Sequence, residues 1–446
     1  MTRTFIAYTP SSRLDRPRPV DYCYRHSIRK VSVRIYRTNV GIVAEYNPLH
    51  LGHVHHIRAA RERAEGANVV VVLSSYCTQR GDAALLSKWD RAETAVNAGA
   101  NLVLELPAFF SCQNAGIFAA SSVDILEATG LVSSISFGME DPDFPVAPIL
   151  DILVHEPPSF KEALKEKLAS GLSYVRSRAQ ALSDIRPEYG EFISTPNNLL
   201  ALSYMERIAR KGYDLTCMPV QRVGALHDDD GLDLPLPSAS AIRNACRDGR
   251  HSEAEKKLPA STALVLRRCI EQGAVVRSDD TLWRIARSAL ARVRREELAL
   301  SSGMTEGMEN RLLRFAFSSG TWEDFLARCA TSRYTKGRIR RQVLHFLLGV
   351  SQRENLELQR SGVAYIRVLA ADEAGRAMLR TMRTSATLPL FGKLPLSVRG
   401  QTGRIASIER TATILWESLA ENVPPGSELR RSPFMAPGPE AGGSAP

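Results

Sequence analysis

The sequence predicts an α/β protein that contains a doubly wound parallel sheet and ends in a mostly helical C-terminal region. In the first 250 residues, short apolar segments rich in β-branched residues alternate with helical segments, a spacing typical of βαβ crossovers. Beyond about Gly249 the strand-like segments fade and amphipathic helical patterns replace them.

The predicted sheet begins with a strand at about Val40. The run 68–74 is almost all valine, as expected of a strand that is buried on both faces. Further strands are predicted at 101–107, 133–138 and 215–220, and helices at 53–65, 86–98, 115–128 and 197–211, with Ser238 capping one more helix.

The chain divides into four predicted parts. Residues 1–38 contain prolines, many arginines and no sustained period, so we expect a disordered extension. Residues 39–249 form the α/β domain, in which 141–196 is an insertion or cover over the sheet. Residues 250–425 form the helical domain, with basic amphipathic helices at 281–297 and 335–348, and 426–446 form a disordered tail.

Composition excludes several classes of protein. Hydrophobic residues make up 44% and charged residues 24% of the 446, and no apolar run approaches the ~20 residues that span a bilayer. The seven scattered cysteines contain no CxxC pair, which favours reduced thiols in the cytoplasm over a disulfide scaffold or zinc ribbon. A net charge of +10 favours a polyanionic partner, although an arginine-rich proteome would give the same charge.

The segment 40–53 is the strongest sign of function. An apolar strand leads into an Asn-Pro turn, and His50-Leu51-Gly52-His53 then opens a helix. A helix N-terminus presents unpaired N–H groups and a partial positive charge, which suit phosphate, and the two imidazoles would add donors. The histidine pair could also hold a metal or be a solvated helix start. The strand-turn-helix context favours phosphate, at the carboxyl end of the strands where ligands of such sheets lie.

Further motifs follow this segment in a characteristic order. They are Gln79–Arg91 (QRGDAALLSKWDR), Gly99–Pro107 (GANLVLELP), Phe118-Ala119, Ser136–Glu140 (SFGME), Thr195–Ala201 (TPNNLLA), Gln221–Gly224 (QRVG), Ser238–Arg243 (SASAIR), Tyr334–Arg338 (YTKGR) and Ala364–Leu369 (AYIRVL). Together they resemble the bacterial tRNA(Met) cytidine acetate ligase family, which is part of the HIGH-motif nucleotidyltransferase superfamily. The resemblance covers roughly residues 40–400.

The resemblance implies a Rossmann-like sheet of the nucleotidyltransferase type, with ATP bound in 39–249 and tRNA bound by 250–425. It implies a cytoplasmic ligase that acetylates the wobble cytidine of elongator tRNA(Met). Free acetate would attack the α-phosphate of ATP, accompanied by Mg²⁺ as its complex, to give acetyl-adenylate and diphosphate. The cytidine amine would then attack the acetyl carbonyl and release AMP.

Site residues follow by position in these motifs. We expect catalytic roles for His50, His53 and Arg243, with Arg243 a bidentate donor to the β- and γ-phosphates, and no metal site on the protein. The tRNA contacts are expected at Lys88, Arg91, Lys336, Arg338 and Arg341. The expected ATP contacts are Val40, Gly41, Ile42, Val43, Ala44, Glu45, Tyr46, Asn47, Pro48, Leu49, His50, Leu51, Gly52, His53, Ser121, Asn198 and Arg222.

Some features depart from the family or leave alternatives open. The sequence has 74–77 Ser-Ser-Tyr-Cys where relatives have Ser-Gly-Asn-Phe, and Ser121 where they have a glycine, so the pocket could be narrower. We read His55 and His56 as incidental, and 228–231 (Asp-Asp-Asp-Gly) as a solvated turn. The competing functions are a small-molecule adenylyltransferase of the same superfamily and a non-catalytic RNA-binding relative. Oligomeric state stays open.

Overall fold

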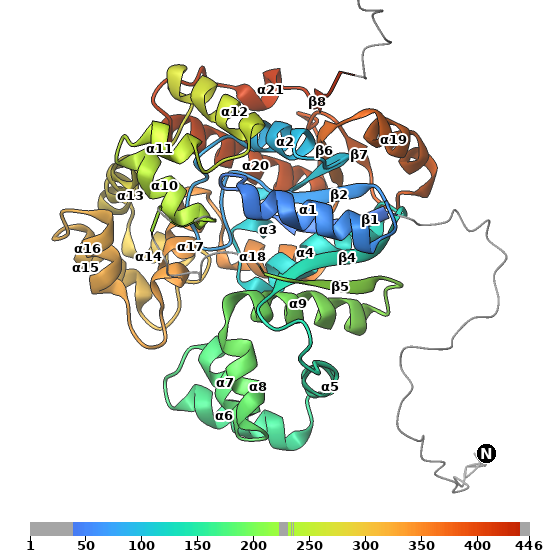
Figure 1. Ribbon diagram of the computed structural model, residues 1–446. Coiled ribbons are helices and arrows are strands. Elements are labelled where there is room, and N and C mark those ends of the chain that lie inside the picture. The colour runs from blue at the N-terminus through green and yellow to red at the C-terminus, as the bar shows by residue number, and fades with distance from the viewer. Residues whose placement is uncertain (1–38, 223–230, 233, 235, 438–446) are drawn as a thin grey trace, which may run out of the picture. The chain divides into compact units, whose positions relative to one another are not determined.

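The structure is a computed structural model that describes residues 39–222, 231–232, 234 and 236–437. In this part of the chain one mixed sheet runs in the order β5-β4-β1-β2-β3-β6-β7, with β8 also paired to β6 (Figure 1). β1 to β5 are mutually parallel. The strands are β1 (Asn39–Ala44), β2 (Val69–Ser74), β3 (Leu102–Leu106), β4 (Val132–Met139), β5 (Thr216–Gln221), β6 (Ile366–Ala371), β7 (Leu390–Phe391) and β8 (Phe434–Met435).

The central strands are buried on both faces, as the sequence predicted. In β2, Val69 and Val71 belong to a core with α1 (Leu51–Arg63) and α2 (Lys88–Asn97). The alternate residues Val70 and Val72 belong to a second core that includes α4 (Ala115–Ala128) and α9 (Pro196–Lys211). Because side chains alternate along a strand, two helical layers require an uninterrupted apolar run. The predicted α/β fold is confirmed.

The remaining helices fill the insertion and the C-terminal half. α3 (Ala108–Ser111) follows β3, and α5 to α8 occupy the predicted insertion, with α6 to α8 grouped beyond α9 in Figure 1. They are α5 (Ala147–His155), α6 (Pro158–Ala169), α7 (Tyr174–Ser183), α8 (Pro187–Ser194), α10 (Ala239–Arg247), α11 (His251–Glu255), α12 (Ala260–Glu271), α13 (Asp279–Arg292), α14 (Arg295–Ala299), α15 (Met308–Ala316), α16 (Trp322–Cys329), α17 (Lys336–Leu347), α18 (Gln352–Ser361), α19 (Glu373–Ser385), α20 (Gly400–Leu419) and α21 (Ser427–Arg430).

The sheet crosses the boundary that we placed at residue 250. β6 lies antiparallel to β3, so a strand from the second half completes the sheet of the first half. All six residues of β6 are buried. The sheet therefore includes strands from both sides of residue 250. The division of the chain into domains at that residue stays a prediction.

Part of the predicted disordered tail is ordered, which corrects the prediction for 426–446. α21 and β8 lie in that stretch, and β8 pairs with β6 through Phe434 and Met435. Glu428 is only 5% exposed and forms ion pairs within the protein. The low apolar content of the tail predicted disorder, because a buried contact through a carboxylate such as that of Glu428 leaves no apolar pattern in the sequence.

Other expectations need smaller corrections. The helix predicted at 281–297 is two helices, α13 and α14, because Val293 is extended between them. The extension 1–38, the three aspartates at 228–230 and the end of the tail, 438–446, lie outside the described residues. Among the helices of the described part, none has the length and apolar character needed to cross a membrane.

Candidate active site

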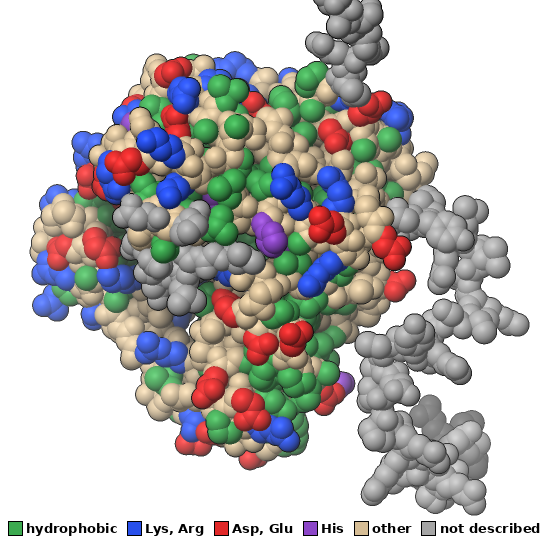
Figure 2. Space-filling model, in the orientation of Figure 1, with side chains coloured by type: hydrophobic (Ala, Val, Ile, Leu, Met, Phe, Trp, Pro, Cys, Tyr) green, Lys and Arg blue, Asp and Glu red, His purple; other side chains and the backbone are tan. Residues whose placement is uncertain are grey.

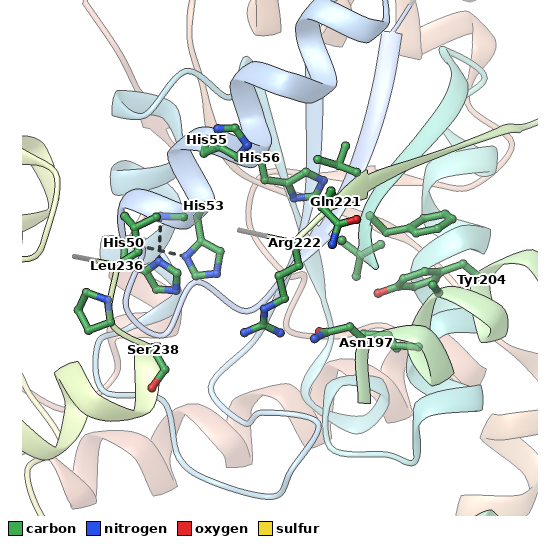
Figure 3. A pocket seen from close by; sticks show the side chains of 18 residues that line it. His50, His53, His55, His56, Asn197, Tyr204, Gln221, Arg222, Leu236 and Ser238 are labelled. Carbon is green, nitrogen blue, oxygen red and sulfur yellow. Dashed lines mark hydrogen bonds between the residues drawn. The ribbon is translucent and has the colours of Figure 1, made fainter. Parts of the chain in front are cut away.

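The turn after β1 places two histidines at the start of α1, at the carboxyl ends of the parallel strands. His50 is the N-cap residue of α1, and its Nδ1 accepts a hydrogen bond from the Gly52 N–H at 3.1 Å. His53 Nδ1 accepts from the His50 N–H at 3.2 Å, which completes a reciprocal cap (Figure 3). The two ring centroids lie 3.8 Å apart. An accepting imidazole nitrogen carries no proton, so each neutral ring is protonated at Nε2.

Burial keeps both rings neutral. Burial, with smaller contributions from Arg222 and Arg243, lowers the pKa of His50 to about 4. Burial and then His50 and His56 lower the pKa of His53 well below its usual value. At neutral pH the helix start therefore presents two Nε2–H donors that carry no charge. This arrangement can bind phosphate oxygens by directed hydrogen bonds without placing two imidazolium ions side by side.

A cleft with two adjoining cavities lies in front of these histidines. The larger cavity is about 330 Å³ and the smaller about 210 Å³, and His50, His53 and Arg222 line both. Tyr204 lines the smaller cavity (Figure 3). Phe137 also lines it, with its ring centroid 5.6 Å from that of Tyr204. The larger cavity has apolar walls as well as polar and charged residues, which include Glu45, Asn47, Arg80, Ser240 and Arg243.

Arg243 enters the cleft from the start of α10. Ser238 caps this helix as predicted, accepting from the Ala241 N–H at 3.1 Å. The Arg243 guanidinium donates to the Asn47 carbonyl at 2.7 Å and to Ser240 Oγ at 3.0 Å. Burial lowers the pKa of Arg243 below its usual value. Both of these hydrogen-bond acceptors are neutral. The carboxylates of Asp82 and Glu45 attract the guanidinium as well, but no carboxylate among the described residues forms an ion pair with it within 4 Å, so its charge can meet an anion in the cleft.

A second cation in the cleft is Arg80, which belongs to the Gln79–Arg91 motif but is not among the predicted site residues. It is exposed, lines the larger cavity and has no ion pair within 4 Å among the described residues. The loop that carries it is fixed on both sides: the Gln79 N–H donates to Glu45 Oε1 at 2.7 Å, and Arg341 donates to the Gln79 carbonyl at 2.9 Å. The signal available in the sequence was an arginine in the loop after β2, at the carboxyl edge of the sheet where ligands bind.

The loop that carries Arg80 requires a glycine at position 81. Its φ is +84°, and a Cβ there would lie 2.7 Å from the backbone nitrogen of Arg341. Arg340 then pairs with Asp82 at 3.1 Å. Both the backbone conformation and the close approach of α17 exclude a side chain, so the loop is held against α17.

The predicted ATP residues separate into two groups. Within 40–53, the cavities are lined by Val43, Ala44, Glu45, Tyr46, Asn47, His50, Gly52 and His53. Val40, Ile42 and Leu49 are core residues with no exposed surface. Arg222 lines both cavities, whereas Ser121 and Asn198 are buried and line neither. Asn198 accepts the Glu140 N–H at 3.0 Å, and its neighbour Asn197 lines the cleft in its place.

We predicted that His56 has no role in the site, but its position in the structure is within the cleft. It lines both cavities, and its Nε2 lies 3.0 Å from Ser136 Oγ on β4. Burial lowers its pKa to about 4. His55 lines only the smaller cavity.

The prediction that Lys88 and Arg91 touch tRNA is contradicted, because both side chains are fully buried. Lys88 pairs with Glu105, with Glu409 at 2.7 Å and with Glu428 at 3.0 Å. Arg91 donates to the carbonyls of Leu86, at 3.2 Å, and of Glu45, at 2.6 Å, and so supports the turn that carries the histidines. The sequence could not reveal this because most of the partners lie elsewhere in the chain.

The three predicted tRNA residues of α17 differ in exposure. Lys336 is exposed beside Glu323, and Arg338 lies over the Tyr334 ring with 4.0 Å from its guanidinium carbon to the centroid. Arg341 is largely buried and holds the Gln79 carbonyl, so it positions the loop of Arg80. Contact of Lys336 and Arg338 with tRNA stays a prediction.

Comparison with known proteins agrees with this geometry. Residues 37–428 match the family described as HIGH Nucleotidyl Transferase. The tRNA(Met) cytidine acetate ligase of Fervidobacterium nodosum is 32% identical over 361 residues, 80% of this chain and 84% of that protein. The ligase of Clostridium novyi is 29% identical over 400 residues, 88% and 98% of the two chains.

Solved structures give the same result. The crystal structure of apo Thermotoga maritima TmcAL superposes with a TM-score of 0.85 at 29% identity, covering 89% of this chain and 99% of that one. A second form of that protein, bound with alpha-thio ATP, gives 0.83 at 28% identity and the same coverage.

The parallel sheet with a histidine-capped helix beside a cationic cleft defines a nucleotidyltransferase of the HIGH type. Within that class, the chain belongs to the tRNA(Met) cytidine acetate ligase family.

Proposed function

We propose that this protein is an ATP-dependent ligase that forms N4-acetylcytidine at the wobble position of elongator tRNA(Met) from free acetate. The observation that carries the proposal is the convergence of His50, His53, Arg80 and Arg243 on one cleft at the carboxyl ends of the strands. The names of the relatives supply the substrate class, and the ATP-analogue complex of the T. maritima protein supports ATP as the activating nucleotide.

The two cavities suit the two ends of ATP. The smaller cavity, with Phe137 and Tyr204, suits the adenosine, since aromatic walls bury a base. Gly138 also lines it, and nothing lies within 4 Å of where a Cβ would be. The larger cavity suits the triphosphate and acetate, where Arg80 and Arg243 would meet the phosphate charge.

The first step is an in-line displacement. An acetate oxygen bonds to the α-phosphorus as the bond to the bridging oxygen of diphosphate breaks, which leaves acetyl-adenylate. The Nε2–H groups of His50 and His53 would donate to phosphate oxygens as charge develops there, and Arg243 would stabilise the departing diphosphate. Because Nδ1 of each ring is engaged with the backbone, these donors are oriented before ATP binds.

In the second step the N4 amine of the cytidine attacks the acetyl carbonyl carbon. The carbon–oxygen bond to AMP breaks, the amine loses a proton and AMP leaves. An unstacked wobble base would have to enter the cleft, as is usual when a protein acts on one base of an RNA loop. A cytoplasmic location follows from a tRNA substrate and belongs to the same proposal.

Mg²⁺ would enter as the ATP complex. Among the described residues no group of three or more histidine, cysteine or carboxylate side chains could hold a metal ion. Its ligands would therefore be mostly phosphate oxygens and water, as is usual for Mg²⁺ with nucleotides. When bound it would neutralise phosphate charge, and the donors of His50, His53 and Arg243 would orient the chain of phosphates.

The test is acetyl transfer with purified full-length protein, ATP, Mg²⁺, labelled acetate and total tRNA, followed by nucleoside analysis. We expect label in N4-acetylcytidine, dependent on ATP and absent with Arg243→Ala. Arg247→Ala, which removes a neighbouring arginine that pairs with Asp279, is the control and should retain activity. Label in a small-molecule product, or none in tRNA while ATP is consumed, would contradict the proposal.

A further inference from the structure

A cluster of arginine and phenylalanine side chains on α13, α15 and α16 lies outside the cleft and takes no part in the reaction described above. The Arg–Phe patch consists of Arg287, Arg311, Arg314, Phe315, Phe317 and Arg328. Phe317 is 67% exposed and is the one phenylalanine among the exposed large hydrophobic side chains of the described residues. In Figure 2, Lys and Arg side chains line the outer edge of the region where Figure 1 places α15 and α16.

Three of the four arginines of the patch are fixed by backbone carbonyls, and the fourth, Arg314, lies over the Phe315 ring. Arg287 donates to the Ala316 carbonyl at 3.1 Å and Arg328 to the Ser318 carbonyl at 2.9 Å, so the two guanidiniums bond on either side of Phe317. Arg311 donates to the Cys329 carbonyl at 2.8 Å, where α16 ends. Carbonyls at a helix C-terminus attract cations, which explains how these side chains are ordered without carboxylates.

The patch concentrates positive charge on an aromatic surface. The guanidinium carbons of Arg311, Arg314 and Arg328 lie 5.4, 5.5 and 4.9 Å from the Phe315 ring centroid. Among the described residues, the one carboxylate within 4 Å of these groups is Asp324, 3.7 Å from Arg328 and itself exposed. The three guanidiniums repel one another, and the backbone carbonyls and the Phe315 ring that hold them leave their net positive charge in place.

We propose that the Arg–Phe patch binds a single-stranded segment of RNA, with a base stacked on Phe317 and phosphates at Arg314 and Arg328. This inference rests on the proposed function in taking that RNA to be the tRNA substrate. The exposed ring favours RNA over an acidic protein segment, because an unstacked base offers a flat face to an aromatic ring as well as phosphate charge to arginine.

Helix α16, which carries Arg328 of the patch, is connected through α17 to the loop of the cleft. Glu323 of α16 lies 3.6 Å from Arg340 of α17, and Arg340 pairs with Asp82 beside Arg80. RNA held at the patch is thereby held by the same packed helices that fix the cleft loop. This geometry lets the patch bind a part of the tRNA other than the nucleotide that reacts.

The experiment measures binding of tRNA and of oligouridine to full-length Phe317→Ala and Arg314→Gln variants across a salt series. We expect Phe317→Ala to weaken both by roughly tenfold, from loss of one stacking contact, and Phe317→Trp to restore binding. Arg314→Gln should flatten the salt slope by about 0.7. Leu300→Ala, at a residue 69% exposed elsewhere, is the matched control and should change nothing.

Acetate-dependent exchange between ATP and diphosphate without tRNA, where the parent protein shows it, separates the two proposals. It should be unchanged in all these variants. Unchanged binding in Phe317→Ala would overturn the RNA patch, and loss of polyglutamate binding in Arg314→Gln alone would replace it with an acidic protein partner. Parent protein that binds oligouridine but not tRNA would instead overturn the proposed function and leave the patch standing.

Discussion

The protein contains two clusters of basic side chains that differ in what faces them. Beneath the sheet edge, Lys88 and Arg367 are fully buried against the carboxylates of Glu105, Glu409 and Glu428. In the cleft, Arg243 donates to two neutral oxygens, and neither Arg243 nor Arg80 forms an ion pair within 4 Å with a described carboxylate.

The difference teaches that the partners of a cation, and not its position in a motif, decide its role. Burial by itself would lower the pKa of Lys88, but Glu105, Glu409 and Glu428 reverse this effect and hold the pKa above its usual range. Such a cation is locked into the fold. A cation that meets only carbonyl or hydroxyl oxygens keeps most of its charge for a ligand.

The largest expected effect is on stability, and it comes from a substitution that breaks the buried cluster. Lys88→Met leaves three buried carboxylates facing too few cations and should lower the free energy of unfolding by about 3–5 kcal/mol. Lys161→Met, on an exposed face of α6, is the matched control and should have little effect. Urea unfolding of the parent and both variants measures the difference. A Lys88→Met protein as stable as the parent but unable to bind tRNA would restore the original prediction for Lys88.

The next effect separates the two roles of a cleft histidine. His53→Asn keeps an acceptor for the His50 N–H but removes the Nε2–H donor, so diphosphate release should fall about 100-fold with little change in stability. His155→Ala, whose side chain is 71% exposed on α5, should leave the rate unchanged. Parent-like rates in His53→Asn would remove the imidazole from the phosphate site.

The smallest effect is a pH dependence. Folding lowers the pKa of His50 and His56 from about 6.5 to about 4, so between these values the unfolded chain binds more protons. Stability should be fully present above pH 6.5 and fall below it, by about 1.4 kcal/mol per pH unit for each histidine. Unfolding free energies at pH 7.0 and 5.5 measure the slope. His56→Gln should make it shallower, and an unchanged slope would show that His56 is not buried as described.

The sequence predicted what depends on neighbouring residues. The valine run of β2, the cap at Ser238 and the strand-turn-helix around His50 are all local patterns, and each lies where expected. Predictions failed where a partner lies far along the chain. Lys88 meets Glu409 across 321 residues, and β6 joins the sheet from the second half. The position of Arg80 in the cleft depends on α17, because Arg341 of that helix holds the carbonyl of the preceding residue, Gln79.

The carboxylate of Glu428 has a consequence for how the chain is made. Lys88 and Glu105 are synthesised more than 300 residues before Glu409 and Glu428. At about 5–20 residues per second, the nucleotide-binding half waits for tens of seconds with one sheet edge open and its buried charges incompletely paired. The last thirty or so residues add β8 and Glu428 after β6 has already reached the sheet. A chain cut short before α21 would retain every residue of the cleft and leave Lys88 and Arg367 with one buried carboxylate fewer.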